Sequence, residues 1–338
     1  MLLLVTAGCG GHPPPSDKPH HTKSGFRNLY IHHNAGSFDF LKWRFQRIGL
    51  SVPGPEDYDF PLNENDRQFL KNNQDKITLT WIGHATVMLR INGKTILTDP
   101  HFSDRASPVS WAGPKRVTRP GILLKDLPHV DMVLISHNHY DHLDKETVKA
   151  LHNRPNGDRT RFFVPLKLKK WFQDQGIENV SELDWWENRA ADGITITAVP
   201  VQHWSKRSMF SRNKSLWCGW VVNTDNFKFF FAADTGYCPI FKQIGEKLGP
   251  FDLSAIPIGA YEPRWFMKPH HVNPEEAIMI HQDVMSKQSV AIHWGTFILT
   301  DEPLDEPLKR LKSARKAKNI PESSFAVLKH GETIILDK

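Results

Sequence analysis

The residues of this 338-residue chain that could do chemistry are concentrated at positions 137–142, which read HNHYDH. This segment directly follows an apolar run at 132–135, which predicts a buried strand. Imidazoles and a carboxylate on one short loop are the ligands that zinc or a similar divalent cation takes in proteins. Groups crowded so closely repel or stay unpaired unless a cation lies among them. The spacing therefore predicts a metal site, against the alternative of a polar loop in a chain with 18 histidines.

Further candidate ligands come directly after other apolar runs. Runs at 199–202, 229–233 and 289–292 end at His203, Asp234 and His293. A single His or Asp after a strand is more often a turn residue. Together with the histidine loop, however, the three residues complete a set of seven ligands, which suits two metal ions that leave a shared water position open.

These motifs resemble the metallo-β-lactamase superfamily and, within it, the N-acylphosphatidylethanolamine-hydrolysing phospholipase D family. The resemblance runs from about residue 81 to about residue 330. Besides the histidine loop with Leu143 and Asp144, it rests on WIGHAT (81–86), LTDP (97–100), RASP (105–108), GPKR (113–116), QHW (202–204), DTGY (234–237), HVNPEEA (271–277) and HWGTF (293–297). The histidine loop alone indicates the superfamily. The tryptophan-flanked segments and GPKR indicate the phospholipase branch.

The resemblance implies an α+β fold, an αββα sandwich, and a binuclear centre with two Zn²⁺ per chain. The implied ligands are His137, His139 and His203 for one ion, Asp141, His142 and His293 for the other, and Asp234 as the bridge. Two cations that share a water lower its pKa toward neutrality, so that hydroxide forms without a strong protein base. That hydroxide is the expected nucleophile.

Four more residues are candidates for roles beside the metals. We expect Asp99 and His84 to orient ligating groups, as a carboxylate does when it accepts the second N–H of an imidazole; a turn-capping Asp99 is the alternative. His271, which the resemblance aligns, is expected to contact the phosphate or to protonate the leaving alkoxide, unless it is a surface histidine. Tyr140 lies inside the metal loop and is expected to point at the substrate. The catalytic candidates are Asp141, Asp234 and His271.

The family resemblance implies a hydrolase that cleaves N-acylphosphatidylethanolamine to N-acylethanolamine and phosphatidic acid. Aromatic clusters at 171–172, 185–186 and 265–267 suit acyl chains or a membrane interface, although at least half are expected to be core residues. A lactonase of the same superfamily acting on a phosphorylated sugar lactone is the alternative. A nuclease is disfavoured because the sequence has no clustered stripe of Lys and Arg with aromatic residues between them, which would bind a nucleic acid. A non-catalytic metal-binding module would have lost a ligand, and all seven positions are filled.

Composition restricts the partners only weakly. Lys+Arg number 43 against 37 Asp+Glu, a net charge of +6 that fits an anionic membrane surface or a nucleic acid about equally. We expect a phospholipid substrate, membrane association and no nucleic acid, with a homodimer left open. The sequence contains no run of about 18 apolar residues, so it predicts no transmembrane helix. Cys9, Cys218 and Cys238 are an odd, dispersed set that predicts no disulfide framework.

The first 25 residues are predicted to be a flexible segment. An apolar run at 1–5 and small residues before Cys9 resemble the end of a bacterial lipoprotein signal with Cys9 acylated. Two departures are the missing basic residue before the run and Thr6 where leucine is usual. The alternative is an untargeted tail on a cytoplasmic enzyme that is peripheral to the membrane. Residues 26–59 are expected to be a packing extension and residues 60–338 the hydrolase domain.

Strands and helices must position the candidate ligands. Strands are predicted at 77–81, 86–91 and 94–97, with an Asn92-Gly93 turn that supplies the positive φ of a tight hairpin. A second hairpin is predicted at 217–222 and 227–232. We expect one helix from Asp141 to 151, one from 274 to 283 behind an Asn-Pro start, and a basic helix or tail at 309–318.

Overall fold

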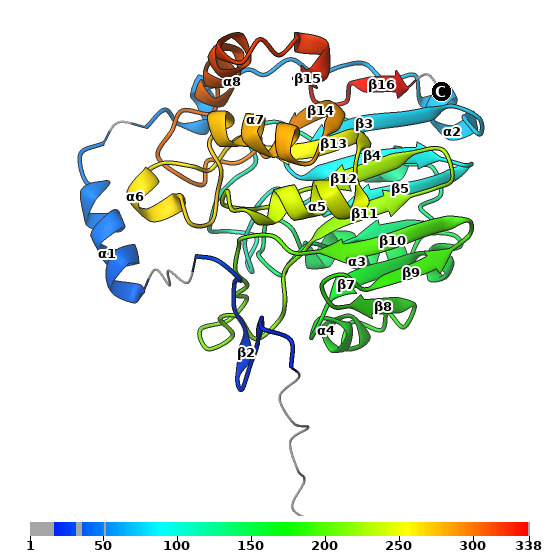
Figure 1. The fold of residues 1–338 in the computed structure, drawn as a ribbon, viewed down its shortest axis with the longest axis horizontal. Helices are drawn as coiled ribbons and strands as arrows, with labels where there is room; N and C mark the ends of the chain where they lie inside the picture. The colour runs from blue at the N-terminus through cyan, green and yellow to red at the C-terminus, as the bar shows by residue number, and fades with distance from the viewer. Residues whose placement is uncertain (1–16, 32–35, 51, 337–338) are drawn as a thin grey trace, which may run out of the picture.

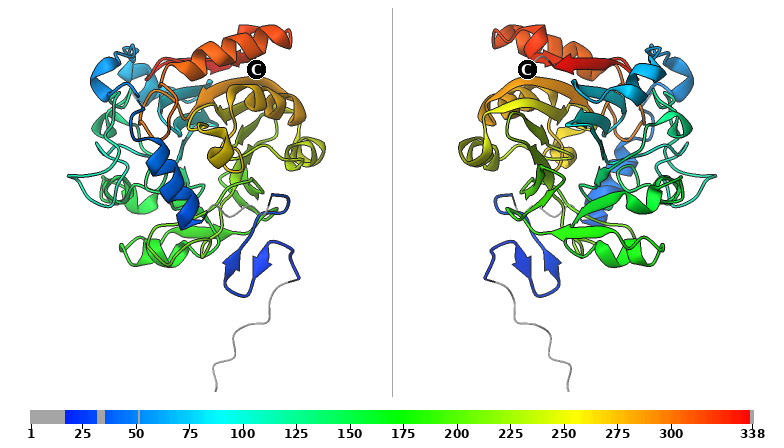
Figure 2. Two further views of the ribbon diagram at one scale, coloured as in Figure 1. Left: turned by 90° about the vertical axis from the view of Figure 1, so that its left-hand side faces the viewer. Right: turned by 90° about the vertical axis from the view of Figure 1, so that its right-hand side faces the viewer.

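Two seven-stranded β-sheets stack face to face, with helices outside them (Figures 1 and 2). The computed structural model describes residues 17–31, 36–50 and 52–336. The arrangement confirms the predicted αββα sandwich. In the described part of the chain, no helix is both long enough and apolar enough to cross a bilayer.

The first sheet has the strand order β16-β3-β4-β5-β6-β7-β8. Its strands are β3 Ile77–Gly83, β4 Thr86–Ile91, β5 Lys94–Thr98, β6 Met132–Leu134, β7 Arg161–Pro165, β8 Val180–Leu183 and β16 Thr333–Leu336. Strands β3, β4 and β5 are antiparallel, as predicted. The turn between β4 and β5 has Asn92 at φ 50° and Gly93 at φ 70°, the left-handed conformation that a tight hairpin requires.

The second sheet has the order β15-β14-β13-β12-β11-β10-β9. Its strands are β9 Asn188–Ala191, β10 Ile194–Val199, β11 Gly219–Asn223, β12 Lys228–Phe231, β13 Phe251–Pro257, β14 Ser286–Ile292 and β15 Phe325–Ala326. The antiparallel pair β11 and β12 confirms the second predicted hairpin. A short ribbon of β1 His21–Thr22 and β2 Gly25–Phe26 precedes the sandwich.

The helices are α1 Ser37–Gln46, α2 Arg67–Asn72, α3 Lys145–His152, α4 Lys169–Gln173, α5 Ile240–Leu248, α6 Arg264–Met267, α7 Pro274–Asp283 and α8 Glu306–Ala317. Helix α7 begins where the sequence predicted, and Asn273 caps it by accepting from the amide of Glu276 at 2.9 Å. Helix α8 confirms a helix in the basic C-terminal segment. The cap at Asn273 fixes the residue at which the loop with His271 ends and α7 begins.

The helix after the metal loop begins later than predicted. Helix α3 begins at Lys145 and not at Asp141. The residues before it form a turn in which the amide of Leu143 donates to the carbonyl of His139. The carboxylate of Asp141 pairs with His84 instead of capping free helix amides. The predicted helix start at Asp141 is therefore wrong, because this carboxylate turns into the cluster of imidazoles.

Alternation along the strands separates two apolar layers. In β4, Val87 and Leu89 lie in the large core that joins the two sheets, whereas Met88 faces the other way. Met88 belongs to a second cluster that includes Val148 and Leu151 of α3. Because successive strand residues point to opposite faces, one sheet can pack on a sheet and on helices at once. The alternation of side chains along the strands thus favours a sheet that is covered on both faces.

The N-terminal segment packs on the sandwich at two places. Phe26 is buried in the large core. His20 and His21 bind the two carboxylate oxygens of Asp184 at 2.7 and 2.9 Å. Cys9 and its predicted acylation lie outside the described residues, and the division at 25/26 and 59/60 stays a prediction.

Candidate metal centre

Side chains that follow five different strands meet at one edge of the sandwich. They are His84 after β3, Asp99 after β5, His203 after β10, Asp234 after β12 and His293 after β14. Three of them have positive φ: 53° at His84, 33° at Asp99 and 62° at His293. Non-glycine residues rarely adopt this conformation, and when they do they are often at functional sites. It turns the chain sharply away from the strand while the side chain stays directed into the cluster.

Three imidazoles face one another in a first group of candidate ligands. Nε2 of His137 lies 2.9 Å from Nδ1 of His139. Nε2 of His203 lies 3.3 Å from the same nitrogen. His137 and His203 are buried, and the three nitrogens lie within 4.8 Å of one another. This is the trio that the sequence predicted for one ion.

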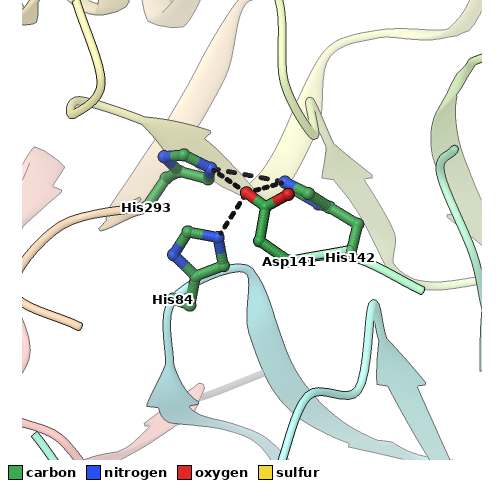
Figure 3. Close-up of side chains that lie close together, drawn as sticks. All are labelled: His84, Asp141, His142 and His293. Atoms are coloured by element: carbon green, nitrogen blue, oxygen red, sulfur yellow. Dashed lines mark hydrogen bonds and ion pairs between the residues drawn. The ribbon is translucent and has the colours of Figure 1, made fainter. Parts of the chain in front are cut away.

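A second group surrounds the carboxylate of Asp141 (Figure 3). Its Oδ2 lies 3.3 Å from Nε2 of His142 and 3.5 Å from Nε2 of His293. The two imidazole nitrogens are 3.3 Å apart. Nε2 of His84 is 3.0 Å from the same Oδ2, so a third imidazole lies within ligand distance of this group. The sequence predicted the first three as ligands and His84 as their support.

The carboxylate of Asp234 lies between the two groups. Its Oδ2 is 3.0 Å from Nε2 of His142, and its Oδ1 is 3.0 Å from Nε2 of His293. Towards the first group, Oδ2 lies 3.8 Å from His203 and 4.0 Å from His137. One carboxylate therefore reaches imidazoles of both groups, which is the placement that a bridging ligand requires.

Hydrogen bonds behind the cluster fix the orientation of three imidazoles. Nδ1 of His142 donates to Asp99 at 2.7 Å, and Nδ1 of His203 donates to the carbonyl of His270 at 2.9 Å. Nδ1 of His137 is 2.8 Å from the hydroxyl of Ser136, which also contacts Asp99. Because the rear nitrogen of each ring is engaged in these contacts, Nε2 is the nitrogen that faces the cluster and is available to a cation.

Burial and charge act in opposite directions on these groups. Burial lowers the pKa of His137 and of His203 well below the ordinary value, so both rings are neutral at pH 7. At His142, burial opposes protonation, but the carboxylates of Asp234 and Asp141 raise the pKa well above the usual range. Burial also disfavours a charged Asp234, yet the imidazoles around it hold its pKa well below the usual range. The carboxylates of Asp141 and Asp234 thus require positive charge among them.

The donor set fits divalent cations. Nitrogens that face one another at 2.9 to 3.3 Å need a proton or a cation between them. Nδ1 of His271 is buried, makes no hydrogen bond within the described residues, and lies 3.9 Å from Oδ2 of Asp234. Imidazole and carboxylate donors suit zinc and related ions. The residues present therefore match a metal-binding cluster with one more polar side chain beside it.

Tyr140 lies on the metal loop, but its hydroxyl bonds to the loop after His203 and not to a candidate ligand. It donates to the carbonyl of Arg207 at 2.7 Å, and the Arg207 guanidinium lies over the ring at 4.3 Å. Its predicted contact with substrate stays a prediction. Of the predicted aromatic clusters, Phe172 and Trp185 are buried core residues, whereas Trp265 is 41% exposed.

Sequence reasoning missed three residues that support the centre. Ser136 directly precedes His137, so its position was a usable signal. Arg207 donates to the carbonyls of residues 138 and 143, and Asn28 donates to the carbonyl of His203 at 2.8 Å. These last contacts span between 64 and 175 residues of sequence. No pattern within a short stretch of sequence predicts contacts over such separations.

Comparison with known proteins agrees with this geometry. A family model described as a beta-lactamase superfamily domain matches residues 94–294. A Caenorhabditis elegans protein named N-acyl-phosphatidylethanolamine-hydrolyzing phospholipase D 1 is 46% identical over 273 residues, which cover 77% of this chain and 76% of that protein. A Saccharomyces cerevisiae protein named as the mitochondrial enzyme of that type is 38% identical over 240 residues, which are 69% of this chain and 50% of that protein.

A solved structure shows the same fold. It is a metallo hydrolase from the hyperthermophilic archaeon Ignicoccus hospitalis, with a TM-score of 0.59 and 20% sequence identity. The match covers 78% of this chain and 100% of that chain. At this identity the likeness concerns the fold.

Proposed function

This chain belongs to the N-acylphosphatidylethanolamine-hydrolysing phospholipase D family of the metallo-β-lactamase superfamily, and we propose that it cleaves the phosphodiester bond of that lipid. The chain is a metal-dependent hydrolase. The proposed products are an N-acylethanolamine and phosphatidic acid. The observation that carries the proposal is the complete cluster of seven candidate ligands in a chain 46% identical to a protein named for this reaction.

We propose two Zn²⁺ per chain. The proposed ligands are His137, His139 and His203 for one ion, Asp141, His142 and His293 for the other, and Asp234 for both. The contacts of Asp234 with His142 and His293 at 3.0 Å, and its approach to His203 at 3.8 Å, support the bridging role. When bound, the two cations supply an activated water and neutralise charge on the phosphate oxygens.

Residues of the chain keep the ligands in place. Asp99 holds His142 in one tautomer, with Nε2 towards Asp234. His84 donates to Asp141 and so fixes the direction in which that carboxylate offers its lone pairs. Since a ligand displaced by 1 Å costs both affinity and rate, these contacts belong to the catalytic arrangement.

We propose that His271 contacts the phosphate of the substrate. Burial lowers the pKa of His271 to about 4, so that its ring is neutral at pH 7. Cations bound beside it would lower that pKa further, because like charges disfavour protonation. A neutral imidazole can donate a hydrogen bond to a phosphate oxygen, but it is a poor source of a full proton. Of the two roles expected for His271, phosphate contact is therefore the one we propose.

We propose that the enzyme works at a membrane surface, because its proposed substrate is a bilayer lipid. Acylation at Cys9 would add an anchor and is tested by Cys9→Ser, which should release the protein from membranes that are washed in high salt. Attachment through surface charge alone would be lost in the same wash, since exposed charges are screened beyond about 10 Å at ~0.1 M salt.

One experiment separates the proposed activity from its alternatives. The purified protein is offered N-acylphosphatidylethanolamine, a phosphorylated sugar lactone and a single-stranded RNA, and the products are identified by mass spectrometry. We expect cleavage of the lipid to N-acylethanolamine and phosphatidic acid, with none by Asp234→Asn. Turnover of the lactone without turnover of the lipid would replace this proposal by the lactonase.

A further inference from the structure

Helix α1 carries an apolar stripe on its solvent side. Phe38, Leu41, Phe45 and, just after the helix, Ile48 recur at intervals of three and four residues, so they lie on one face. Their exposed fractions are 78%, 53%, 70% and 76%. Trp43, on the other side of the helix, is buried. Within the described part of the chain, no other segment covers this stripe, so it is exposed to solvent.

The other side of α1 is fixed to the segment that leads to the metal centre. Trp43 stacks on Phe266 with 5.6 Å between ring centroids, and Lys42 lies 4.6 Å over the ring of Trp265. Figure 1 shows α1 and α6 together on one side of the sandwich. Because α6 is followed directly by the loop with His271, the stripe lies on the same side as the centre.

A second exposed apolar tip belongs to the loop after His203. Met209 and Phe210 are 78% and 86% exposed. The same loop is held against the metal loop by Arg207, whose guanidinium donates to the carbonyls of Asn138 at 3.1 Å and Leu143 at 2.7 Å. The tip is thus fixed beside the ligands.

A third tip is Trp111, which is 79% exposed. Its loop returns to the centre through Arg116, which donates to the carbonyl of His101 at 2.8 Å and pairs by a β-bridge with Phe297. Phe297 follows the candidate ligand His293 by four residues. All these apolar residues therefore stand on segments tied to the metal centre.

The same segments hold the excess positive charge of the chain. Residues 36–50, 102–119, 204–215 and 263–271 contain 13 of the 43 Lys and Arg residues but only 2 of the 37 Asp and Glu residues. The remainder, with 30 basic and 35 acidic residues, is net negative. Apolar tips flanked by cations are the composition of a surface that enters an anionic membrane interface.

We propose that the exposed apolar residues of these four segments form one interfacial surface, which docks on an anionic lipid bilayer on the side of the metal centre. This inference rests on the proposed function, since it names the surface from which the lipid substrate would be taken. A second copy of the chain fits this surface less well than an anionic bilayer does. A symmetric dimer through this surface would place its cations against the same cations of the partner.

The test measures binding to vesicles that contain no substrate. Wild-type protein is sedimented with sucrose-loaded vesicles of phosphatidylcholine, with and without phosphatidylglycerol, beside the triple variant Phe38→Ser, Phe45→Ser and Ile48→Ser. Fully burying one such side chain contributes about 1.5–3 kcal/mol. Partial insertion of three therefore predicts at least about a tenfold weaker partition for the variant, and tighter binding of the wild type to the anionic vesicles.

Met285→Ser is the matched control. Met285 is 46% exposed and precedes the first residue of β14, whose seven residues separate it from His293 by roughly 20 Å. We expect this variant to bind vesicles as the wild type does. Both variants should hydrolyse the water-soluble diester bis(p-nitrophenyl) phosphate at the wild-type rate, because no ligand is changed.

Three results would overturn the proposal. They are a wild type that does not bind anionic vesicles, a triple variant that binds as tightly as the wild type, and sedimentation analysis showing a wild-type dimer that the triple variant dissociates without any vesicle binding. If the wild type binds these vesicles and the triple variant does not, while neither cleaves N-acylphosphatidylethanolamine, the proposed function fails and the interfacial surface stands.

Discussion

Asp99 lies directly behind His142, with 2.7 Å between its Oδ2 and Nδ1 of the ring, and neither side chain is exposed. The carboxylate also accepts from the amide of Ser136 at 2.7 Å. These bonds hold the ring so that its Nε2 faces Asp234 at 3.0 Å. Two aspartates thus contact one imidazole: Asp99 orients it from behind, and Asp234, the proposed bridge, faces its other nitrogen.

Replacement of that orienting carboxylate should weaken metal binding. In Asp99→Asn, the amide cannot accept from His142 and from Ser136 as the carboxylate does, so the tautomer of the ring is no longer fixed. We expect metal affinity to fall by about 10- to 100-fold, measured by competition with a chelating dye. Asp104→Asn, an exposed aspartate nearby, is the control. Unchanged affinity in Asp99→Asn would show that the contact has no orienting role.

Asp234→Asn should abolish nearly all turnover while the fold is kept. A neutral amide cannot balance two cations, although its size matches that of the carboxylate. Turnover of N-acylphosphatidylethanolamine and the circular dichroism spectrum are the two measurements. Activity within tenfold of the wild type would count against a bridge at this position.

Metal analysis of dialysed protein should find about two divalent ions per chain. Seven donors around one ion, five of them from buried residues, would leave imidazoles unsatisfied, and buried polar groups are nearly always paired. Removal of the metal by a chelator should abolish activity, and zinc should restore it. A single ion at full activity would reject the binuclear centre.

His271→Ala tests the contact with phosphate. A hydrogen bond to a charged group contributes about 1.5–3 kcal/mol, so kcat/KM should fall by about 10- to 100-fold. Loss of a proton donor would instead lower kcat by about 10² to 10⁴ and would change the pH profile. A decrease in that larger range, with an altered alkaline limb, would assign proton donation to His271.

The attachment of the N-terminal segment should depend on pH. Burial opposes a charged Asp184, but hydrogen bonds from His20 and Lys18 hold its pKa below the ordinary 3.8. A carboxyl with a lowered folded-state pKa stabilises the fold above its unfolded-state pKa, and that stabilisation is lost as the pH falls through the folded-state value. The hydrogen-exchange protection factors of residues 18–26, which are corrected for the intrinsic pH dependence of amide exchange, should therefore fall below about pH 4.

Asp184→Asn should remove this dependence and loosen the segment already at pH 7. Asp192→Asn, which changes an exposed aspartate that pairs with Lys94 at 3.7 Å, should leave it intact. Equal exchange in the Asp184→Asn variant and the wild type at pH 7 would show that the carboxylate does not hold the segment.

Much of the centre could be predicted from the sequence for a local reason. A buried strand is an apolar run, and the residue that follows it must leave the sheet at its edge. His203, Asp234 and His293 could be identified because each ends such a run. The hairpin at Asn92 and Gly93 and the capped start of α7 were likewise predictable, because turn and cap chemistry act over four residues or fewer.

The tertiary structure alone decided which groups meet across the sandwich. His84 and Asp141, 57 positions apart, come together only when β3 and the metal loop share an edge. That same contact draws Asp141 away from the helix start where sequence reasoning had placed it. Asp184 receives His20 from 164 positions away, and Arg207 reaches the metal loop from 64. Hydrogen bonds of this kind leave no periodic pattern in the sequence. The packing of the two sheets, and not the neighbouring residues in sequence, determines which groups become partners.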